Sequence, residues 1–244
     1  MGTFLASGLK SVMEVDACCI ESVLIKGETL YTSKDLFTLA ALKNEIPSDM
    51  EMVIVEWTGA VLRDAVRESR SQDPAKECAW FFQCDKDMDF DATGKELLIV
   101  NGAPLDEQRV YRVAVAWKGI YKYRANPVLK AWLEENPDGM PPTGEAGVPA
   151  KVLLVRYFCK FIWQKLPSFE ELDTSGDGFL DKKEVEKAYL HAFGMDVDGD
   201  GEIEEHEIRA VVQSVDMLIN SLDKNGDGKV SRDEYEHLLG DTKM

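Results

Sequence analysis

The chain has 244 residues, of which 45% are hydrophobic, and a formal net charge of −17 at pH 7. This length and composition are typical of a globular protein with one or two domains. The acidity is uneven: from Ser168 onward, 21 Asp and Glu stand against 8 Lys and Arg, so this segment carries −13 of the total. Such a surface attracts cations and argues against a nucleic-acid partner. No apolar run reaches the ~18–20 residues that span a bilayer, so no transmembrane segment is expected.

The first ten residues, MGTFLASGLK, do not resemble an export signal. Their apolar residues have helical spacing, without a continuous apolar core or a cleavage site. Five cysteines form no metal-binding or redox spacing, and their odd number and apolar settings favour reduced thiols. These two features favour a cytoplasmic location, which the sequence does not otherwise determine.

Hydrophobic periodicity predicts a mixture of helices and strands over the first 120 residues. We expect helices at 3–14, 34–42 and 59–69, and strands at 15–20, 52–57, 80–84, 97–100 and 110–116. Thr32 or Ser33 can cap the second helix and Thr58 the third. The strand 110–116 is apolar on both faces, which is typical of a central strand. This order predicts an α/β or α+β layered domain over residues 1–125.

The rest of the chain is expected to form a linker and a helical domain. Residues 126–167 contain a turn-rich loop and a helix predicted at about 149–165, and we interpret them as a connecting segment. Ser168 and Glu171 form a capping box that begins a short helix. Residues 168–244 then form the second domain, which is predicted to be all-α. Its helix over 208–222 has a wide apolar face, which could open as a groove when a metal ion binds or pack permanently on the first domain.

Three twelve-residue segments of the acidic tail share one pattern: loop one is DTSGDGFLDKKE (173–184), loop two is DVDGDGEIEEHE (196–207) and loop three is DKNGDGKVSRDE (223–234). An EF-hand calcium loop has oxygen ligands at positions 1, 3, 5 and 9, a backbone carbonyl ligand at 7, glycine at 6 and a bidentate glutamate at 12. The predicted ligands, with carbonyl oxygens at position 7, are Asp173, Ser175, Asp177, Phe179, Asp181 and Glu184 in loop one, Asp196, Asp198, Asp200, Glu202, Glu204 and Glu207 in loop two, and Asp223, Asn225, Asp227, Lys229, Ser231 and Glu234 in loop three.

The donor chemistry of these loops selects the ion. Calcium takes six to eight oxygens in a flexible shell, whereas magnesium requires a tighter octahedron, so a bidentate glutamate favours calcium. Three complete loops predict up to three Ca²⁺ ions per chain. EF-hand loops commonly pair through a short β-contact, and the spacing leaves open which two of the three do so. We predict no catalytic residue and no organic cofactor, because the three histidines lie in or beside the helices of these loops.

The first half of the chain resembles the C-terminal domain of the 5′-nucleotidase family, the domain that holds the nucleoside part of the substrate. The resemblance covers about half the chain. It rests on Asp16-Ala-Cys-Cys-Ile-Glu21, Thr32-Ser-Lys-Asp-Leu36, Thr58-Gly59 and, most closely, Val100-Asn-Gly-Ala-Pro-Leu-Asp106 followed by Val110-Tyr-Arg-Val-Ala114. Their order and spacing agree with the family pattern, and the resemblance implies a layered α/β fold.

Several positions depart from that family pattern. Glu21 stands where the resemblance implies an arginine, so an anionic substrate would be repelled there. Ala41-Leu42 replaces a Pro-Phe pair whose ring stacks on the base, and Leu42 has no flat aromatic face. The family's two-metal catalytic site belongs to a metallophosphatase domain that would precede this segment.

The sequence therefore supports two main hypotheses. In the first, the chain is a non-catalytic calcium sensor or buffer on a nucleotidase-like scaffold, and its partners are calcium ions and, for a sensor, another protein. In the second, it is the substrate-recognition and calcium-regulatory half of a 5′-nucleotidase-type hydrolase of nucleotide catabolism, whose metallophosphatase domain would be its partner.

Overall fold

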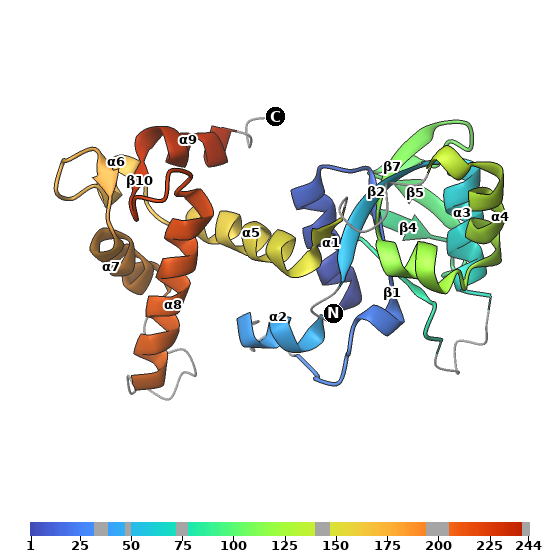
Figure 1. Ribbon diagram of the computed structural model, residues 1–244, viewed down its shortest axis with the longest axis horizontal. Coiled ribbons are helices and arrows are strands. Elements are labelled where there is room, and N and C mark those ends of the chain that lie inside the picture. The colour runs from blue at the N-terminus through green and yellow to red at the C-terminus, as the bar shows by residue number, and fades with distance from the viewer. Residues whose placement is uncertain (32–38, 47–49, 72–77, 140–146, 194–204, 241–244) are drawn as a thin grey trace. The chain divides into compact units, whose positions relative to one another are not determined.

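The computed structural model describes residues 1–31, 39–46, 50–71, 78–139, 147–193 and 205–240. The chain divides into two compact units, Met1–Tyr157 and Phe158–Met244. The first unit mixes helices and strands, and the second is mainly helical (Figure 1). The predicted combination of a layered α/β region followed by a helical region is therefore confirmed.

A five-stranded sheet forms the centre of the first unit, in the order β3-β1-β7-β2-β8. Its strands are β1 (Ala17–Glu21), β2 (Glu51–Thr58), β3 (Phe82–Cys84), β7 (Val110–Ala116) and β8 (Val148–Pro149). Strands β1 and β7 run parallel, whereas β1–β3, β2–β7 and β2–β8 are antiparallel. The expected central strand is β7, which lies between β1 and β2 and is buried on both faces from Val113 to Ala116.

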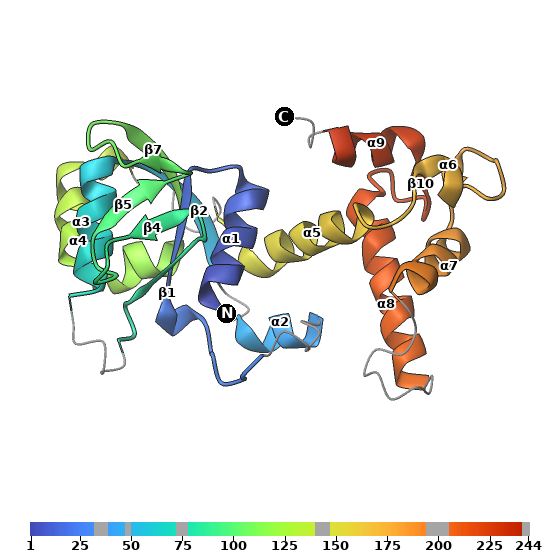
Figure 2. The same cartoon turned by 180° about the vertical axis from the view of Figure 1, so that it is seen from behind.

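Helices cover both faces of this sheet. Helix α1 (Gly2–Met13) lies on one face, and α3 (Gly59–Ser69) and α4 (Pro127–Glu135) lie on the other (Figures 1 and 2). The apolar periodicity of α1 places Leu5 and Leu9 in the core, where both are fully buried. Thr58 caps α3 as predicted, because its Oγ1 accepts a hydrogen bond of 3.4 Å from the Val61 N–H.

Two parts of the first unit differ from the predicted elements. Helix α2 (Leu39–Glu45) covers the end of the helix expected at 34–42, while residues 32–38 with both candidate caps lie outside the described residues. Helix α4 was not predicted, although Asn126-Pro127 is a recognisable start signal: the Asn126 Oδ1 accepts hydrogen bonds from two N–H groups and proline occupies the first turn.

The remaining short elements complete the first unit. A second sheet contains β4 (Met88–Phe90), β5 (Leu97–Val100) and β6 (Ala103–Pro104), and the Asn101-Gly102 turn joins its last two strands with φ angles of 55° and 73°. The helical turns are η1 (Ser22–Leu24), the π-helical η2 (Lys118–Tyr123) and η3 (Pro137–Gly139). All five cysteines are free thiols.

A buried ion pair connects α1 to the turns before β4 and after β5. The Lys10 Nζ lies 3.3 Å from the Asp85 Oδ1 and 2.6 Å from the Asp87 Oδ2, and it also donates to the Asn101 Oδ1. The Asp85 side chain is fully buried, and its Oδ2 accepts a hydrogen bond from the Cys18 N–H. Lys10 thus supplies the counter-charge that a buried carboxylate requires.

The second unit is built from helices and one two-stranded ribbon. Helix α5 (Ala150–Trp163) leads into it, followed by α6 (Phe169–Leu172), α7 (Lys182–Phe193), α8 (Glu205–Leu222) and α9 (Arg232–Gly240). Strands β9 (Phe179–Leu180) and β10 (Val230–Ser231) form the ribbon. In the part of the chain that the structure describes, no helix has the length and apolar character needed to cross a membrane.

The described part of the apolar face of α8, from residue 212 onward, is packed within the second unit. Val215, Leu218, Ile219 and Leu222 are buried, and the Trp163 Nε1 donates a 3.2 Å hydrogen bond to the Leu218 carbonyl. The Trp163 ring also packs edge-on against the Tyr235 ring of α9, with 5.7 Å between the ring centroids. This hydrogen bond and ring contact join α5, α8 and α9 around one tryptophan.

Candidate calcium sites

Loops one and three lie between helices in the arrangement that an EF-hand requires. Loop one connects α6 to α7, and loop three connects α8 to α9. In both, the outgoing helix begins at position 10 of the twelve-residue pattern, and the position-6 glycine adopts a left-handed conformation, with φ of 82° at Gly178 and 80° at Gly228. The capping box of Ser168 and Glu171 begins α6 as predicted.

The aspartate at position 1 organises each loop. In loop one, the Asp173 carboxylate accepts hydrogen bonds from the N–H groups of Gly176 (2.7 Å) and Gly178 (2.9 Å). In loop three, the Asp223 carboxylate accepts the equivalent bonds from Gly226 (2.7 Å) and Gly228 (2.8 Å). The two backbones therefore turn around their first ligand in the same way.

The glutamate at position 12 closes each loop. The Glu184 Oε1 accepts a 2.9 Å hydrogen bond from the Ser175 N–H, and its Oε2 accepts a 3.0 Å bond from the Asp181 N–H. The Glu234 Oε1 and Oε2 accept 2.9 Å bonds from the N–H groups of Lys224 and Ser231, respectively. Each carboxylate thus spans its loop from the second or third position to the ninth.

The two loops are joined through β9 and β10. Leu180 lies opposite Val230 and Phe179 lies opposite Ser231 in an antiparallel register, and both Leu180 and Val230 are fully buried. These are the position-8 residues and their neighbours. The structure therefore answers the question that the spacing left open: loops one and three form the pair.

Lys229 contacts a predicted ligand of the opposite loop. Its Nζ lies 3.2 Å from the Asp177 Oδ2, and both side chains are about half exposed. The Phe179 N–H and the Lys229 ammonium together lower the pKa of Asp177. Burial opposes the ionisation of Glu234, but hydrogen bonds from the N–H groups of Ser231 and Lys224 outweigh it and lower its pKa. Both carboxylates are therefore ionised at neutral pH.

Loop two lies almost entirely outside the described residues. Asp196, Asp198, Asp200, Glu202 and Glu204 fall in the undescribed segment 194–204. Glu207 lies in the described backbone of α8, but its side chain is not described. The ligand groups of loop two, five side chains and the carbonyl of Glu202, consequently have no described geometry.

The carboxylate side chains of loops one and three accept hydrogen bonds from the backbone and are not gathered around a common centre. No group of three or more His, Cys, Asp and Glu side chains in the described ranges is arranged to hold a metal ion. The carboxylates of Asp173, Glu184, Asp223 and Glu234 are instead bonded to N–H groups of their own loops. The donor set itself consists of hard oxygens on a preformed turn, which fits calcium chemically.

Comparison with known proteins agrees with this local architecture. Residues 166–240 match the family model described as an EF-hand domain pair, and this span contains α6 to α9 and all three loops. A search of curated proteins finds no match to the chain.

Three solved structures are similar over part of the chain. NAD nucleotidase (NadN) from Haemophilus influenzae aligns with a TM-score of 0.47 and 13% identity over 66% of this chain, and a 5′-nucleotidase precursor from Thermus thermophilus aligns with 0.44 and 15% over 64%. Sulfate thiohydrolase SoxB, also from Thermus thermophilus, aligns with a TM-score of 0.39 and 15% identity over 64%. The chain spans 28%, 31% and 28% of the length of these three proteins. Residues 166–240 thus match an EF-hand domain pair, and such a pair implies calcium binding.

Proposed function

We propose that this chain is a calcium-binding protein that holds up to three Ca²⁺ ions in loops one, two and three and performs no catalysis by itself. The observation that carries the proposal is the β9–β10 pairing, because it sets two complete oxygen-rich loops side by side. The ligands would be Asp173, Ser175, Asp177, Phe179, Asp181 and Glu184 in loop one, Asp196, Asp198, Asp200, Glu202, Glu204 and Glu207 in loop two, and Asp223, Asn225, Asp227, Lys229, Ser231 and Glu234 in loop three, with the carbonyl oxygens of Phe179, Glu202 and Lys229 at position 7.

Ion binding in loops one and three requires a local exchange of partners. The carboxylates that now accept backbone N–H hydrogen bonds would turn part of their oxygen surface toward the ion. The bound ion would also offset the mutual repulsion of the ligand carboxylates. Calcium should therefore stabilise the second unit by mass action, since it binds the folded loops and not the unfolded chain.

Calorimetric titration of the whole chain with calcium tests the proposal. We expect about three ions per chain, and the Glu207→Gln variant should lose the contribution of loop two alone. A stoichiometry below two would refute the proposal. Magnesium is the matched competitor, because its smaller octahedral shell makes poor use of a bidentate carboxylate.

A calcium sensor and a calcium buffer differ in what the bound state exposes. The buried C-terminal half of the α8 face, with Val215, Leu218 and Leu222, supports the buffer, because a sensor must open such a face to a partner protein. If the chain is a calcium buffer, the fluorescence of a hydrophobic dye should not change during a calcium titration. A calcium-dependent rise in dye fluorescence would identify a sensor with a protein partner.

The resemblance of the first unit to the 5′-nucleotidase C-terminal domain supports a second candidate. In that case the chain recognises substrate and confers calcium regulation for a hydrolytic domain that acts with it. Phosphate release from nucleoside monophosphates with manganese or zinc separates the two candidates. Turnover by the purified chain above a buffer blank would contradict the non-catalytic proposal.

A further inference from the structure

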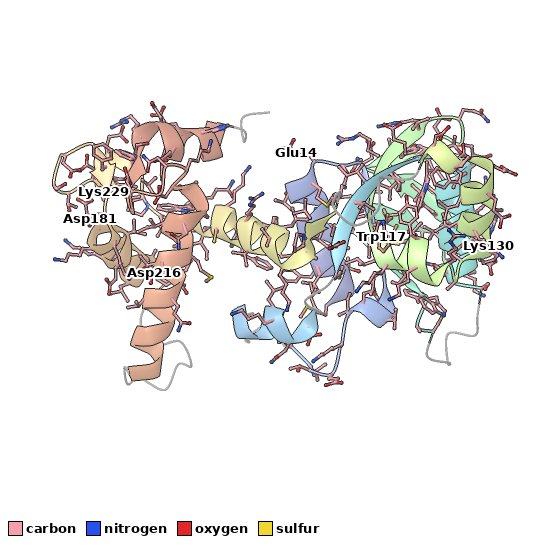
Figure 3. All side chains as sticks on the ribbon, in the orientation of Figure 1. Glu14, Trp117, Lys130, Asp181, Asp216 and Lys229 are labelled. Atoms are coloured by element: carbon pink, nitrogen blue, oxygen red, sulfur yellow. The ribbon has the colours of Figure 1, made fainter. Side chains whose placement is uncertain are left out.

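Two cysteine side chains face each other at one edge of the five-stranded sheet. Cys19 of β1 and Cys84 of β3 lie opposite each other in an antiparallel register, and their Sγ atoms are 3.9 Å apart. Strand β3 is the edge strand, and on its other side β1 pairs with β7, which ends just before Trp117 (labelled in Figure 3). The two cysteines are 65 residues apart in the sequence, so only the pairing of the strands brings their thiols together.

The hydrogen-bond pattern of β1 and β3 places the two thiols at a position of close approach. The Asp85 N–H donates a 3.1 Å hydrogen bond to the Cys18 carbonyl, so these neighbouring residues form a hydrogen-bonded pair. Hydrogen-bonded and non-hydrogen-bonded pairs alternate along antiparallel strands, so Cys19 and Cys84 form a non-hydrogen-bonded pair, whose Cα atoms are typically about 4.5 Å apart. That separation lies within the range of roughly 4.4–6.8 Å that a disulfide bridges. A disulfide can therefore join the two strands without a change of register.

A guanidinium group lies beside one sulfur of the pair. The Arg70 Nη2 is 3.5 Å from the Cys84 Sγ, and hydrogen bonds to the carbonyls of Gly94 (2.8 Å) and Phe82 (3.3 Å) hold Arg70 in place. A hydrogen bond from Cys19 and the charge of Arg70 lower the pKa of Cys84, against the opposing effect of burial. The contact with Cys84 and burial raise the pKa of Cys19. Because the thiolate is the nucleophile in thiol oxidation, Cys84 is the sulfur that reacts first and Cys19 is its resolving partner.

The position of β3 at the sheet edge gives a small oxidant access to this pair. Strand β3 has three residues, ends at Cys84, and pairs with β1 alone among the strands that the structure describes. Segments held by few contacts open locally at a lower free energy than the centre of a sheet. Cys84 is 4% exposed and Cys19 is fully buried, so opening of β3 uncovers the more reactive sulfur first.

The other cysteines of the first unit lack this arrangement. Successive side chains of a strand point to opposite faces of the sheet, so Cys18 faces away from Cys84. Accordingly, Cys19 and Cys84 belong to the apolar cluster beneath α3, whereas Cys18 does not. The half-buried Cys78 contacts the Ser69 carbonyl, with 4.0 Å between its Sγ and that oxygen. Within the described structure, Cys19 and Cys84 are thus the two residues whose sulfur atoms meet.

We propose that Cys19 and Cys84 are a reversible redox pair that hydrogen peroxide converts to a cross-strand disulfide. The Cys84 thiolate attacks one peroxide oxygen, so that an S–O bond forms, the O–O bond breaks and the sulfur is oxidised to a sulfenic acid. The departing hydroxide takes up the proton that Cys84 has lost and becomes water. Cys19 then attacks the sulfenic sulfur, the S–O bond breaks as the S–S bond forms, and its thiol proton leaves with the hydroxide as a second water. A small dithiol reverses the reaction by thiol–disulfide exchange.

Peroxide treatment of the reduced whole chain, followed by alkylation of the remaining thiols and mass spectrometry of tryptic peptides, tests the proposal. Cleavage after Lys and Arg places Cys19 with Cys18 in peptide 11–26, and Cys84 with Cys78 in peptide 77–86. We expect these two peptides to be joined by a disulfide that a dithiol breaks again. The Cys18→Ala/Cys78→Ala double variant leaves one cysteine in each peptide and should give the same link. Two alkylated peptides from the parent chain, or a sulfinic acid on Cys84 without a link, would overturn the proposal.

Matched single variants extend this test. Cys19→Ala should abolish the link and Cys18→Ala should keep it, although both side chains are fully buried neighbours in β1. A link that persists in Cys19→Ala would contradict the assignment.

The role of the guanidinium group is tested by the rate of disulfide formation. Arg70→Gln should slow the reaction roughly tenfold, because it removes the charge that stabilises the Cys84 thiolate. Arg67→Gln is the control, since the Arg67 side chain is 44% exposed and pairs with Glu96. An unchanged rate in a folded Arg70→Gln variant would contradict activation by the guanidinium. Calcium stoichiometry is measured separately, so this proposal and the calcium proposal can fail independently.

Discussion

Leu180 and Val230 lie opposite each other in the β9–β10 ribbon, and both are fully buried. They are the position-8 residues of loops one and three, which are separated in sequence by the whole of loop two. The pairing makes these two loops a structural unit and leaves loop two in the connection between them. A substitution in one strand of the ribbon should therefore affect calcium binding at both loops.

We expect Leu180→Ala to weaken calcium binding at loops one and three together. Loss of a buried leucine side chain costs about 2–5 kcal/mol, and the cavity lies at the contact that aligns the two backbones. Thermal unfolding and calorimetric calcium titration measure the two effects. Phe179→Ala is the control, because its side chain in the same strand is 39% exposed. Loss of affinity at one loop alone would contradict the pairing.

Glu184→Gln and Glu234→Gln should each weaken one calcium site. Each substitution removes the charge from a carboxylate that is predicted to supply two oxygens, so a loss of roughly 10–100-fold is expected at the altered loop. Calorimetry of the single variants measures this. Glu236→Gln provides the matched control in α9, since Glu236 is exposed and lies beyond the twelve-residue pattern. An equal loss of calcium affinity in Glu236→Gln and Glu234→Gln would show that the loss comes only from the change in net charge.

Removal of the Lys229 ammonium should strengthen the calcium site of loop one. Lys229 occupies one carboxylate oxygen of Asp177, and the Lys229→Gln variant frees it while keeping the backbone carbonyl at position 7. The pair is exposed, so we expect a gain of no more than about fivefold. Lys224→Gln removes the same charge from loop three without this contact. An equal gain in both variants would rule out the specific competition.

Lys10→Met should destabilise the first unit strongly. Removing one partner of a buried ion pair leaves an uncompensated charge on Asp85 and costs about 3–5 kcal/mol. Chemical denaturation measures this change in the free energy of unfolding. Lys86→Met is the control: Lys86 lies 2.9 Å from Asp87, but its side chain is 72% exposed, so little change is expected. Similar losses in both variants would contradict a special role for the buried pair.

The ion pair between Lys10 and Asp87 contributes to the loss of folding stability at low pH. The hydrogen bonds from Lys10 and Lys86 lower the pKa of Asp87 from 3.8. A carboxylate with a lowered pKa in the folded state contributes stability above its unfolded-state pKa and loses it as the pH falls through the folded-state value. The Lys10→Met variant should therefore lose less stability than the parent chain below about pH 4. Parallel acid denaturation curves for the two proteins would disprove this.

Glu21→Gln should stabilise the first unit at alkaline pH. The pKa of Glu21 is raised from 4.5 to about 7, so its contribution to stability is fully present below pH 4.5 and is lost as the pH rises to about 7. The glutamine variant lacks this loss, and at pH 8 it should be more stable than the parent chain by on the order of 3 kcal/mol. Denaturation at pH 5 and pH 8 measures the difference. An unchanged pH profile would show that Glu21 is not desolvated.

Local sequence patterns predicted much of this protein because they report on local energetics. The periodicity of α1, β1, β2 and β7, the Thr58 cap and the capping box at Ser168 all depend on contacts within a few residues. The twelve-residue loops belong to the same class, because consecutive backbone and side-chain oxygens determine their chemistry. Helix α4 carried such a signal in Asn126-Pro127, which hydrophobic periodicity alone does not register.

Tertiary structure alone decided the relationships between distant residues. Loop one pairs with loop three because the packing of α6 to α9 brings Leu180 to Val230, and no spacing rule in the sequence distinguishes that choice. Gly119 of η2 likewise lies against Glu21 of β1 only because the fold brings these distant residues together. The sequence specified which side chains are charged and which carry oxygen ligands. The burial of these side chains and the distances between them depend on long-range packing. Burial and distance together determine the free-energy cost of each charge and the partner that it can bind.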